Sequence, residues 1–362
     1  MSVDLPADRT PVREDLADLE PYGAPQLDVA VRLNTNETAE PPPPGFLAAV
    51  AQRLPAVKLN RYPDRRATRL RTLLGEVHDL GPNRVWAANG SNEVLQQLLQ
   101  AYGGPGRTLL TTRPGYSMYP VLGRVTATNV VEVDLDDEFL LTPDAAAAAV
   151  AEHDPHVVFV ANPNNPTGIP LALDVVVALH DAGQGLVVVD EAYVEFGGES
   201  AVRLLDELPR LVVSRTFSKA YRMAGLRLGY MYAAPWVIDD LRRVRLPYHL
   251  DALKQVAAEV AVEQRNTLLT HLADVARERE RVHAALVAMP GIVPIPSVAN
   301  FILFRCDVAG VWQGLLDRGV LVRDFSSKPR LQGCQRVTIG TPVENDAFLA
   351  ALGDVVADGQ PA

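Results

Sequence analysis

The sequence predicts an α/β fold, in which a large, doubly wound and mostly parallel sheet domain is joined to a smaller α+β domain. From Val85 onward, short apolar runs alternate with helical patterns, which is the pattern of βαβ units. Polar clusters directly follow several of these runs, where open α/β sheets bind their ligands. The length of 362 residues accommodates a large domain and a smaller companion.

The composition narrows the classes of partner. The chain is 48% hydrophobic and 22% charged, which is typical of a soluble globular protein. Its formal net charge of −10 argues against a nucleic-acid partner, because phosphate-backbone binding needs a basic face. Cys306 and Cys334 are too few for a disulfide framework. With no secretory signal and no apolar run of about 18 residues, we expect a cytoplasmic protein with no membrane partner.

The first part of the chain, residues 1–55, is expected to form an N-terminal arm and part of the smaller domain. Tyr22 lies between two prolines, and its local sequence favours packing over chemistry. Prolines 41–44 end the polar segment that contains Asn36, and a helix is expected to run from Gly45 to about Leu54. Tyr62 follows in a turn and is interpreted, for a monomer, as a half-exposed loop aromatic.

The large domain is expected to span residues 56–250. Its strands are predicted from apolar runs at 85–88, 108–112, 130–135, 157–160, 186–189 and 211–213. A capped helix is predicted after Asn89, and an alanine-rich helix at 145–151. The last part, residues 251–362, is expected to form an interdomain helix that reaches about Met289 and a C-terminal small domain with strands near 299–304, 320–324 and 336–341.

The stretch from Ser214 to Gly229 carries the most specific chemistry. If Lys219 forms an imine with an aldehyde cofactor, Thr216 and Ser218 offer hydroxyl groups to a phosphate on that cofactor. Arg227 adds a guanidinium fork for the same phosphate, and the set describes a pyridoxal-phosphate site. Taken alone, a lysine or arginine is more often a solvated residue or a surface ion pair, and that alternative stays open here.

Two other segments fit the same cofactor. The helix start at Ser91 and Asn92 presents free N–H groups that suit an anion, although a plain capped helix is the common alternative. Tyr116 follows a strand end, where it stacks on a planar ring or, as the alternative, packs as a core tyrosine. Asn165 lies in a loop stiffened by two prolines, from which it is predicted to donate a hydrogen bond to a ring oxygen.

A carboxylate and two arginines complete the candidate site. Asp190 ends the most buried-looking strand, where a pyridinium nitrogen would provide its partner; the alternative is a helix cap. Tyr193 is predicted to bond the phenolic oxygen of the ring. Arg323 and Arg336, at strand edges, suit a substrate with two anionic groups. His153 has a nearby histidine at i+3 but no further ligand, so no metal is expected.

With these residues in place, the chain resembles the fold-type I pyridoxal-phosphate aminotransferases, and among them the histidinol-phosphate aminotransferase family of histidine biosynthesis. The motifs appear in the family's order: Asn-Gly-Ser-Asn-Glu, Asn-Pro-Asn-Asn-Pro-Thr-Gly, Val-Asp-Glu-Ala-Tyr, Ser-Lys-Ala and Gly-Leu-Arg-Leu-Gly. The sequence departs from the family at Asn36-Glu37-Thr38-Ala39, where Asn-Glu-Asn-Pro is usual.

The resemblance implies a homodimer with shared active sites, in which Tyr62 reaches the cofactor phosphate of the other subunit. It implies that Lys219 binds the cofactor covalently and then serves as the base for a 1,3-proton shift. It further implies that Arg336 takes the carboxylate of L-glutamate or 2-oxoglutarate and Arg323 the phosphate of L-histidinol phosphate. The residues implied to line the same cleft are Tyr22, Asn36 and Asn300.

The expected reaction is therefore the transamination of L-histidinol phosphate with 2-oxoglutarate, giving imidazole acetol phosphate and L-glutamate. The first alternative is an aromatic-amino-acid aminotransferase acting on phenylalanine, because such relatives share every cofactor residue. A non-catalytic cofactor-binding or regulatory protein on the same fold is a further alternative. It gives no reason to keep Lys219, Asp190, Asn165, Tyr193 and Arg227 together.

Overall fold

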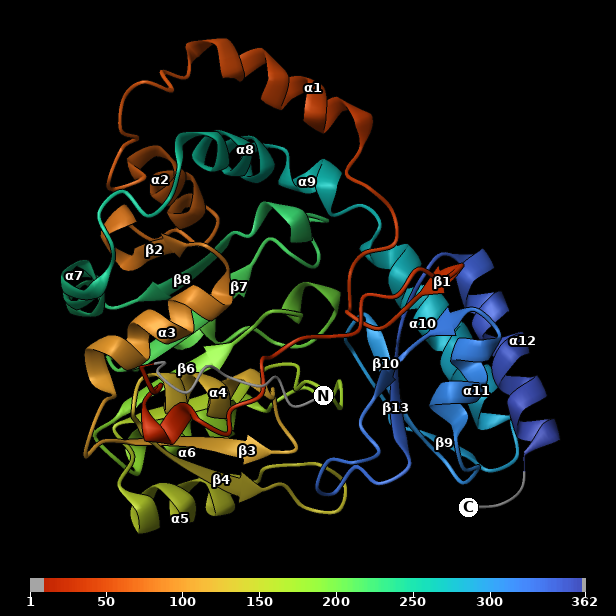
Figure 1. Ribbon diagram of the computed structural model, residues 1–362. Helices are drawn as coiled ribbons and strands as arrows, with labels where there is room; N and C mark the ends of the chain where they lie inside the picture. The colour runs from red at the N-terminus through yellow and green to blue at the C-terminus, as the bar shows by residue number, and fades with distance from the viewer. Residues whose placement is uncertain (1–9, 360–362) are drawn as a thin grey trace.

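The computed structural model describes residues 10–359, which fold into a larger body built on one sheet and a smaller body formed mainly by the C-terminal part (Figure 1). Within these residues, the large sheet has seven strands in the order β2-β8-β7-β6-β5-β3-β4. The two pairings made by β8 are antiparallel and the others are parallel. The strands are β2 (Val85–Ala88), β3 (Thr108–Arg113), β4 (Asn129–Asp134), β5 (Val157–Ala161), β6 (Leu186–Asp190), β7 (Leu211–Thr216) and β8 (Gly229–Ala233).

Helices cover both faces of the sheet, so the predicted α/β class and the mostly parallel sheet are confirmed. Successive residues of the central strands point to opposite faces. Val187 and Val189 belong to one core with residues of α2, α5, α6 and α8, whereas Val188 belongs to the other, with residues of α3, α4 and α7. These helices are α2 (Thr68–Glu76), α3 (Ser91–Tyr102), α4 (Met118–Val125), α5 (Pro143–His153), α6 (Leu173–Asp181), α7 (Pro235–Val244) and α8 (Ala252–Glu263).

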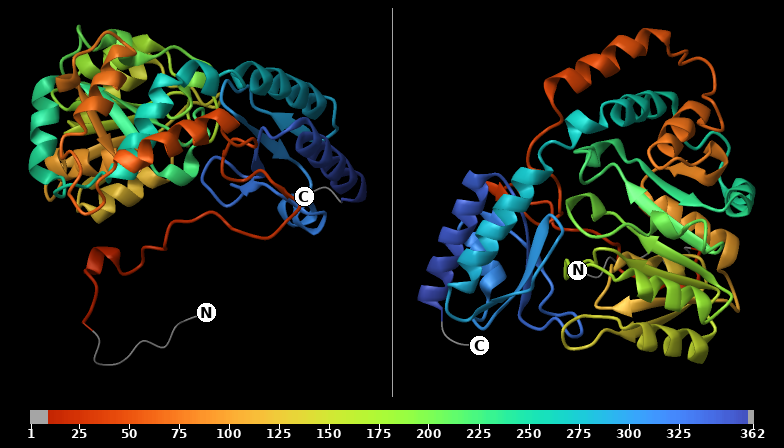
Figure 2. Two further views of the ribbon diagram at one scale, coloured as in Figure 1. Left: turned by 90° about the horizontal axis from the view of Figure 1, so that it is seen from above. Right: turned by 180° about the vertical axis from the view of Figure 1, so that it is seen from behind.

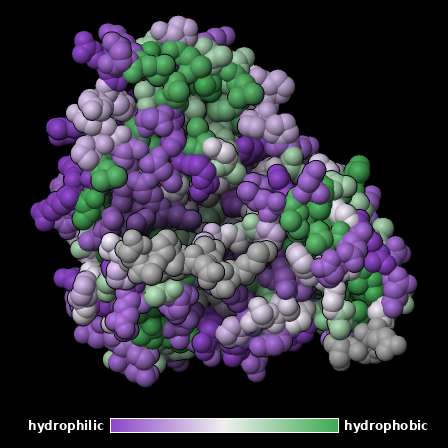
Figure 3. All heavy atoms as spheres, in the orientation of Figure 1, coloured by the Kyte–Doolittle hydropathy of each residue, from purple (hydrophilic) through white to green (hydrophobic). Residues whose placement is uncertain are grey.

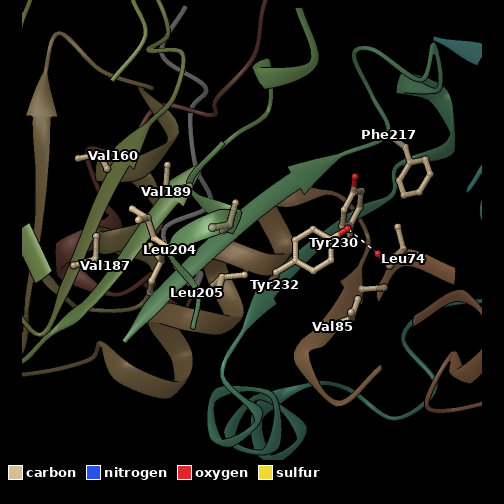
Figure 4. Packing of buried hydrophobic residues seen from close by; sticks show 14 of the residues in the cluster. Leu74, Val85, Val160, Val187, Val189, Leu204, Leu205, Phe217, Tyr230 and Tyr232 are labelled. Atoms are coloured by element: carbon tan, nitrogen blue, oxygen red, sulfur yellow. Dashed lines mark hydrogen bonds between the residues drawn. The ribbon is translucent and has the colours of Figure 1, made fainter. Parts of the chain in front are cut away.

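The first of these cores extends to β8 through aromatic side chains (Figure 4). On β8, the ring of Tyr230 packs against Phe217, which directly follows β7, and the ring of Tyr232 packs edge-on against Tyr230. The buried hydroxyl of Tyr232 donates to the carbonyl oxygen of Leu74 at 2.9 Å, so its polar tip is satisfied within the core. This packing fixes the segment after β7 that contains Lys219.

The smaller body contains an antiparallel sheet and helices, which agrees with the α+β class predicted from the sequence. Its strand order is β12-β13-β10-β9, and Leu303 on β10 lies opposite Arg336 on β13. The elements are α10 (Leu272–Val287), β9 (Ile292–Pro294), β10 (Phe301–Cys306), α11 (Val311–Asp317), β12 (Arg323–Asp324), β13 (Cys334–Thr338) and α12 (Pro342–Asp358). Near the N-terminus, β1 (Val31–Arg32) pairs in parallel with β11 (Val320–Leu321), which joins the early chain to this body.

The described chain begins against the larger body, where Arg13 donates to the carbonyl oxygen of Arg124 on α4, and it reaches the smaller body at β1. After β1, residues 33–43, here called the crossing segment, lead to α1 (Pro44–Arg53), which packs on α8 at the end of the larger body (Figure 2). The chain returns through α9 (Arg265–Leu268) to α10. Short 3-10 helices occur at Glu14–Leu16, Leu54–Ala56, Pro82–Arg84, Val194–Phe196, Ala201–Leu204 and Ala224–Leu226.

The packing of α1 and α8 bears on the domain boundaries. We expected residues 1–55 and 251–362 to lie outside the large domain, but α8 packs on both α1 and α2. Ala258 and Leu268 belong to the main core of the large sheet. The interdomain helix expected to reach Met289 is divided into α8, α9 and α10, and α10 packs on β9 and β10 of the smaller sheet. We therefore propose that the second boundary lies between Leu268 and Leu272.

Candidate active site

A cavity of about 500 Å³ lies where the carboxyl ends of β5, β6 and β7 face the smaller body. The larger body contributes Lys219 and Asp190, and the smaller body contributes Arg323 and Arg336. Most of the residues singled out in the sequence line this one space. They are Tyr22, Asn36, Ser91, Asn92, Tyr116, Asn165, Asp190, Tyr193, Thr216, Ser218, Lys219, Arg227, Arg323 and Arg336.

Lys219 lies three residues after the end of β7, with its amine held at the cavity. Its Nζ donates a hydrogen bond to the carbonyl oxygen of Thr35 at 2.7 Å. Desolvation, reinforced by the charge of Arg336, lowers the pKa of Lys219 from 10.5 to about 7. A substantial fraction of this amine is therefore unprotonated at neutral pH, as a nucleophile or proton acceptor requires.

Asp190 is the last residue of β6 and is 5% exposed. Its Oδ2 accepts a hydrogen bond from the hydroxyl of Tyr119 at 3.1 Å, whereas its buried Oδ1 has no partner among the described residues. Burial raises the pKa of Asp190 from 3.8 to about 6, and the hydrogen bond from Tyr119 acts in the opposite direction. A cationic N–H donor in the cavity would satisfy Oδ1 and favour the ionised carboxylate.

An anion cradle forms at the first turn of α3. Gly90, with φ of 93°, directly precedes the helix. The side-chain cap that was expected is not formed, so the N–H groups of Ser91 and Asn92 remain available to an anion. Arg227 reaches this turn and donates to the hydroxyl of Ser218 at 3.2 Å. A positive helix end, a hydroxyl and a guanidinium thus converge on one place.

Close backbone approach creates this cradle, and Gly229 permits it. A Cβ on Gly229 would lie 2.2 Å from the amide nitrogen of Ser91. A Cβ on Gly90 would lie 3.1 Å from Nη2 of Arg227. Beside the cradle, Thr216 is 4% exposed, and its hydroxyl accepts the backbone N–H of Ser218 at 3.1 Å.

Aromatic rings form one wall of the cavity. The hydroxyl of Tyr116 bonds Oδ1 of Asn92 at 3.3 Å, and its ring meets those of Tyr119 and Tyr22 edge-on at centroid distances of 5.3 and 6.5 Å. These contacts hold Tyr116 above the space between Asp190 and the cradle, in reach of a planar ligand. Tyr119 was not singled out from the sequence, although its i+3 spacing from Tyr116 offered a weak signal.

The opposite wall carries the two arginines. Arg323 on β12 and Arg336 on β13 lie directly opposite each other in the antiparallel pair. Arg336 is 6% exposed and donates to Oδ1 of Asn165 at 2.5 Å and to the carbonyl oxygen of Asn34 at 3.0 Å. Arg323 donates to the carbonyl oxygen of Gly23 at 3.2 Å. Two like charges placed opposite each other repel unless an anion lies between them.

Asn36 and Tyr193 join the two walls. The Nδ2 of Asn36 donates to the hydroxyl of Tyr193 at 3.0 Å, and the backbone N–H of Asn36 donates to the hydroxyl of Thr338 at 2.9 Å. Asn36 is 1% exposed and has φ of 55°, so the crossing segment makes a tight, fully bonded bend there. The bend brings elements of both bodies to one side of the cavity.

Asn300 and Tyr62 do not line the cavity of their own chain. Asn300 is placed behind Asn36 rather than on the cavity wall, because its amide donates to the carbonyl oxygen of Asn36 at 3.1 Å. Tyr62 is 79% exposed and stacks on Tyr248 with a centroid distance of 4.3 Å, outside the cavity of its own chain. Such an exposed aromatic pair is free to contact another molecule.

Comparisons with known proteins define the class. The family model for aminotransferase class I and II matches residues 28–352. The solved histidinol-phosphate aminotransferase of Sinorhizobium meliloti, in complex with pyridoxal-5'-phosphate, superposes with a TM-score of 0.83 at 26% sequence identity and covers 91% of each chain. Fold and site together are those of a class I and II aminotransferase.

Sequence relatives then narrow the family. The histidinol-phosphate aminotransferase of Paenarthrobacter aurescens strain TC1 is 48% identical over 364 residues, covering 97% of this chain and 96% of that protein. That of Mycolicibacterium smegmatis is 50% identical over 354 residues, covering 94% and 92%. The chain therefore belongs to the histidinol-phosphate aminotransferase family.

Proposed function

We propose that this chain is a pyridoxal-phosphate-dependent aminotransferase of histidine biosynthesis. It transfers the amino group of L-histidinol phosphate to 2-oxoglutarate, giving imidazole acetol phosphate and L-glutamate. The reaction is reversible. The observation that carries the proposal is the convergence of Lys219, Asp190, the α3 cradle and two arginines on one cavity. The names of the relatives, at 48 to 50% identity, favour histidinol phosphate over an aromatic amino acid as substrate.

The residues present fit pyridoxal phosphate. Its phosphate matches the cradle of Ser91, Asn92, Ser218 and Arg227, because helix N–H groups and a guanidinium are good phosphate ligands. Its ring nitrogen, when protonated, matches the unpartnered Oδ1 of Asp190. When bound, the cofactor supplies an aldehyde for the amine of Lys219 and a ring that withdraws electrons from the reacting carbon of the substrate.

The protein groups then have distinct roles. Lys219, with its pKa near 7, would accept a proton from the substrate carbon at Nζ and return it to the position two bonds away, which is a 1,3-proton shift. Asp190 keeps the ring nitrogen protonated, which maintains the electron withdrawal. Tyr116, Asn165 and Tyr193 line the cavity, where Tyr116 would stack on the ring and Asn165 and Tyr193 would hold its phenolic oxygen. Thr216 supports the cradle beside Ser218 through their hydrogen bond.

The two arginines select the substrates. Arg336 binds the carboxylate of glutamate or 2-oxoglutarate, since its planar fork suits a bidentate carboxylate. Arg323 binds the phosphate of histidinol phosphate from the neighbouring strand. Tyr22 and Asn36 line the same end of the cavity and confine the substrate. Asn300 contributes from behind, by holding Asn36 in place.

The working form is proposed to be a homodimer in the cytoplasm, with each Tyr62 reaching the cofactor phosphate of its partner. The exposure of Tyr62 and its stacking on Tyr248 support this arrangement. Apolar side chains also gather over α1 and the segment that follows it (Figure 3); among them Leu47 is 63% and Leu59 is 74% exposed. Exposed apolar patches of this kind mark interaction surfaces. None of the helices in residues 10–359 combines the length and apolar character needed to cross a membrane.

The deciding experiment is a single-turnover titration of the cofactor-loaded protein with L-histidinol phosphate and L-phenylalanine side by side. The visible absorbance of the bound cofactor reports consumption of the loaded form. Much faster conversion with L-histidinol phosphate is expected. Equal or faster conversion with L-phenylalanine would move the function to aromatic transamination, and absence of any cofactor absorbance would remove the enzyme assignment itself.

A further inference from the structure

The crossing segment lies along the loop that carries the catalytic lysine, residues 217–222, here called the lysine loop. It contacts Lys219 at two points. The Nζ of Lys219 donates to the carbonyl oxygen of Thr35 at 2.7 Å, and the hydroxyl of Thr38 donates to the backbone carbonyl oxygen of Lys219 at 2.7 Å. One short stretch of chain thus holds both the amine and the backbone of the same residue.

A third contact strengthens the alignment of the two segments. Nη1 of Arg222, in the lysine loop, donates to the carbonyl oxygen of Pro41 at 3.0 Å and lies 3.4 Å from the carboxylate of Glu40. The backbone N–H of Arg222 also donates to the carbonyl oxygen of Lys219 at 2.9 Å, which closes the loop. The carbonyl of Lys219 therefore accepts one bond from its own loop and one from Thr38, which is 181 residues away in the sequence.

The crossing segment is fixed to the smaller body just before it reaches Thr38. Thr338 and Asn300 bond the backbone of Asn36 at 2.9 and 3.1 Å. Arg336 bonds the carbonyl oxygen of Asn34 at 3.0 Å. Thr38 is consequently the side chain through which a segment anchored in the smaller body grips the lysine backbone in the larger body.

We propose that Thr38 is a positioning residue for Lys219, an inference that rests on the proposed function. The amine of Lys219 must leave the cofactor, act as a base and return in each half-reaction. The Thr38 hydroxyl fixes the lysine backbone, and the Thr35 carbonyl receives the free amine, so both ends of the side chain are held by one segment. The amine therefore starts each step from a defined place, which is the geometric condition for efficient proton transfer.

The test compares Thr38→Val, which removes the hydroxyl at nearly constant volume, with Thr38→Ser, which keeps it. The first readout is the rate at which each apoprotein recombines with pyridoxal phosphate. In that step the Lys219 amine adds to the aldehyde carbon, a C=N bond replaces C=O, and water leaves with both amine protons. Loss of one neutral hydrogen bond predicts recombination about threefold to tenfold slower in Thr38→Val.

The kinetic constants provide the second readout. In Thr38→Val we expect kcat to fall by a similar factor while the KM for L-glutamate stays unchanged, because Arg336 keeps its partners. Thr38→Ser should restore both the recombination rate and kcat. A general disturbance of the cavity would instead change KM together with kcat. The matched control is Thr72→Val on the outside of α2, where the hydroxyl bonds only the carbonyl of Thr68 at 3.0 Å.

Each outcome decides one question. If Thr38→Val behaves as the wild type, or if Thr38→Ser is as slow as Thr38→Val, the inference fails while the proposed function stands. If the wild-type apoprotein itself gains no cofactor absorbance, the proposed function fails. Should Thr38→Val not fold, as judged by its thermal unfolding, Thr38→Ala against Thr38→Ser makes the same comparison.

Discussion

Asp190 is a residue whose burial opposes the stability of the folded chain. Burial raises its pKa from 3.8 to about 6, so the folded protein without cofactor binds this proton more tightly than the unfolded chain does. Its free energy of unfolding therefore falls as the pH rises from 3.8 to about 6, and the loss persists at higher pH. A carboxylate kept in such a place is expected to serve a ligand.

The first prediction is that Asp190→Asn stabilises the cofactor-free protein at pH 7 to 8. The amide removes the cost of a buried charge, and a pKa difference of two units sets a gain of about 2 to 3 kcal/mol. Thermal or urea unfolding of the apoproteins at pH 4 and pH 7.5 measures the effect, which should vanish at pH 4. The same variant should lose most of its transaminase activity.

The control for this prediction is Asp354→Asn on α12, which is exposed. Surface changes of this kind stay within about 0.5 kcal/mol. If Asp190→Asn is no more stable than this control at pH 7.5, Asp190 does not carry an uncompensated charge in the apoprotein.

The second prediction concerns Tyr119, whose hydroxyl lowers the pKa of Asp190. In Tyr119→Phe the carboxylate of Asp190 loses this bond, so its pKa rises. As the pH is lowered, cofactor affinity should therefore be lost at a pH that is higher than in the parent protein by about half a unit to one unit. Equilibrium binding of pyridoxal phosphate across pH 5 to 8 measures the midpoint. The measurement uses a Lys219→Ala background, because the amine of Lys219 titrates near pH 7.

The phosphate of the cofactor titrates equally in both proteins, so only the difference between them reports on Asp190. An unchanged midpoint would mean that Tyr119 is merely a packing residue.

At the scale of residues, sequence was most informative where chemistry restricts the choice of side chain. Lys219, Asp190 and Arg227 were found because few structural roles need those groups after a buried strand. Tyr119 was missed, because its role depends on contacts with the carboxylate of Asp190 and the ring of Tyr116 that appear only in three dimensions. Asn300 was expected on the cavity wall, whereas its amide bonds the carbonyl oxygen of Asn36 from behind. The sequence does not show whether a residue lines a cavity or supports a residue that does.

At the scale of elements, the antiparallel pairing of β12 with β13 brings Arg323 and Arg336 together in one site. Arg323 and Arg336 are thirteen positions apart but share one rung of the sheet. Their proximity leaves each guanidinium with a different anchor, Gly23 for Arg323 and Asn165 with Asn34 for Arg336. The anchors keep the two forks apart, so each can bind a different anionic group.

The third prediction follows from this division. Arg323→Ala should raise the KM for L-histidinol phosphate by about tenfold or more, since a charged hydrogen bond to phosphate is lost. The KM for L-glutamate should change by less than about twofold, because Arg336 is untouched. Steady-state kinetics with each amino donor measures both values, and Arg323→Lys should lie between. Equal losses for the two donors would remove the phosphate role.

Element boundaries were predicted where turn residues mark them, but strand β8 and the division of the interdomain helix into three helices were missed, and so was the packing. The helix expected at 45–54 is α1 at Pro44–Arg53, because the proline run and Gly45 mark its start. The apolar spacing beyond residue 251 did not reveal that α8 packs with α1 on the larger body, since periodicity gives the buried face but not the partner. The need for glycine at position 229 is likewise visible only in the structure, where β8 approaches the first turn of α3.

At the scale of the whole molecule, the chain builds its cavity from two bodies, and Tyr62 lies outside the cavity of its own chain. Tyr62 is exposed beside Tyr248, and the nearby patch on α1 is apolar. Sequence alone favoured a loop aromatic for Tyr62, and only the resemblance to the family reversed that interpretation. A contact between subunits leaves no pattern in the periodicity of one chain. The proposal of shared sites therefore needs a test that depends on two chains at once.

The last prediction uses hybrid dimers. Lys219→Ala removes the lysine of its own site, while Tyr62→Ala removes the tyrosine given to the partner site. Each variant alone should be inactive or strongly impaired. Mixed in equal amounts under exchange, half of the dimers are hybrids, and each hybrid has one site with both residues intact. Because the dimer is two-fold symmetric, activity should recover to about a quarter of the wild type.

Recovery would establish that Lys219 and Tyr62 of one site come from different chains. If both residues of a site belonged to the same chain, every site in every dimer would lack one of them, and mixing would restore nothing. Size-exclusion chromatography of the mixture must show dimers, so that a lack of recovery reflects the make-up of the site rather than a failure to associate.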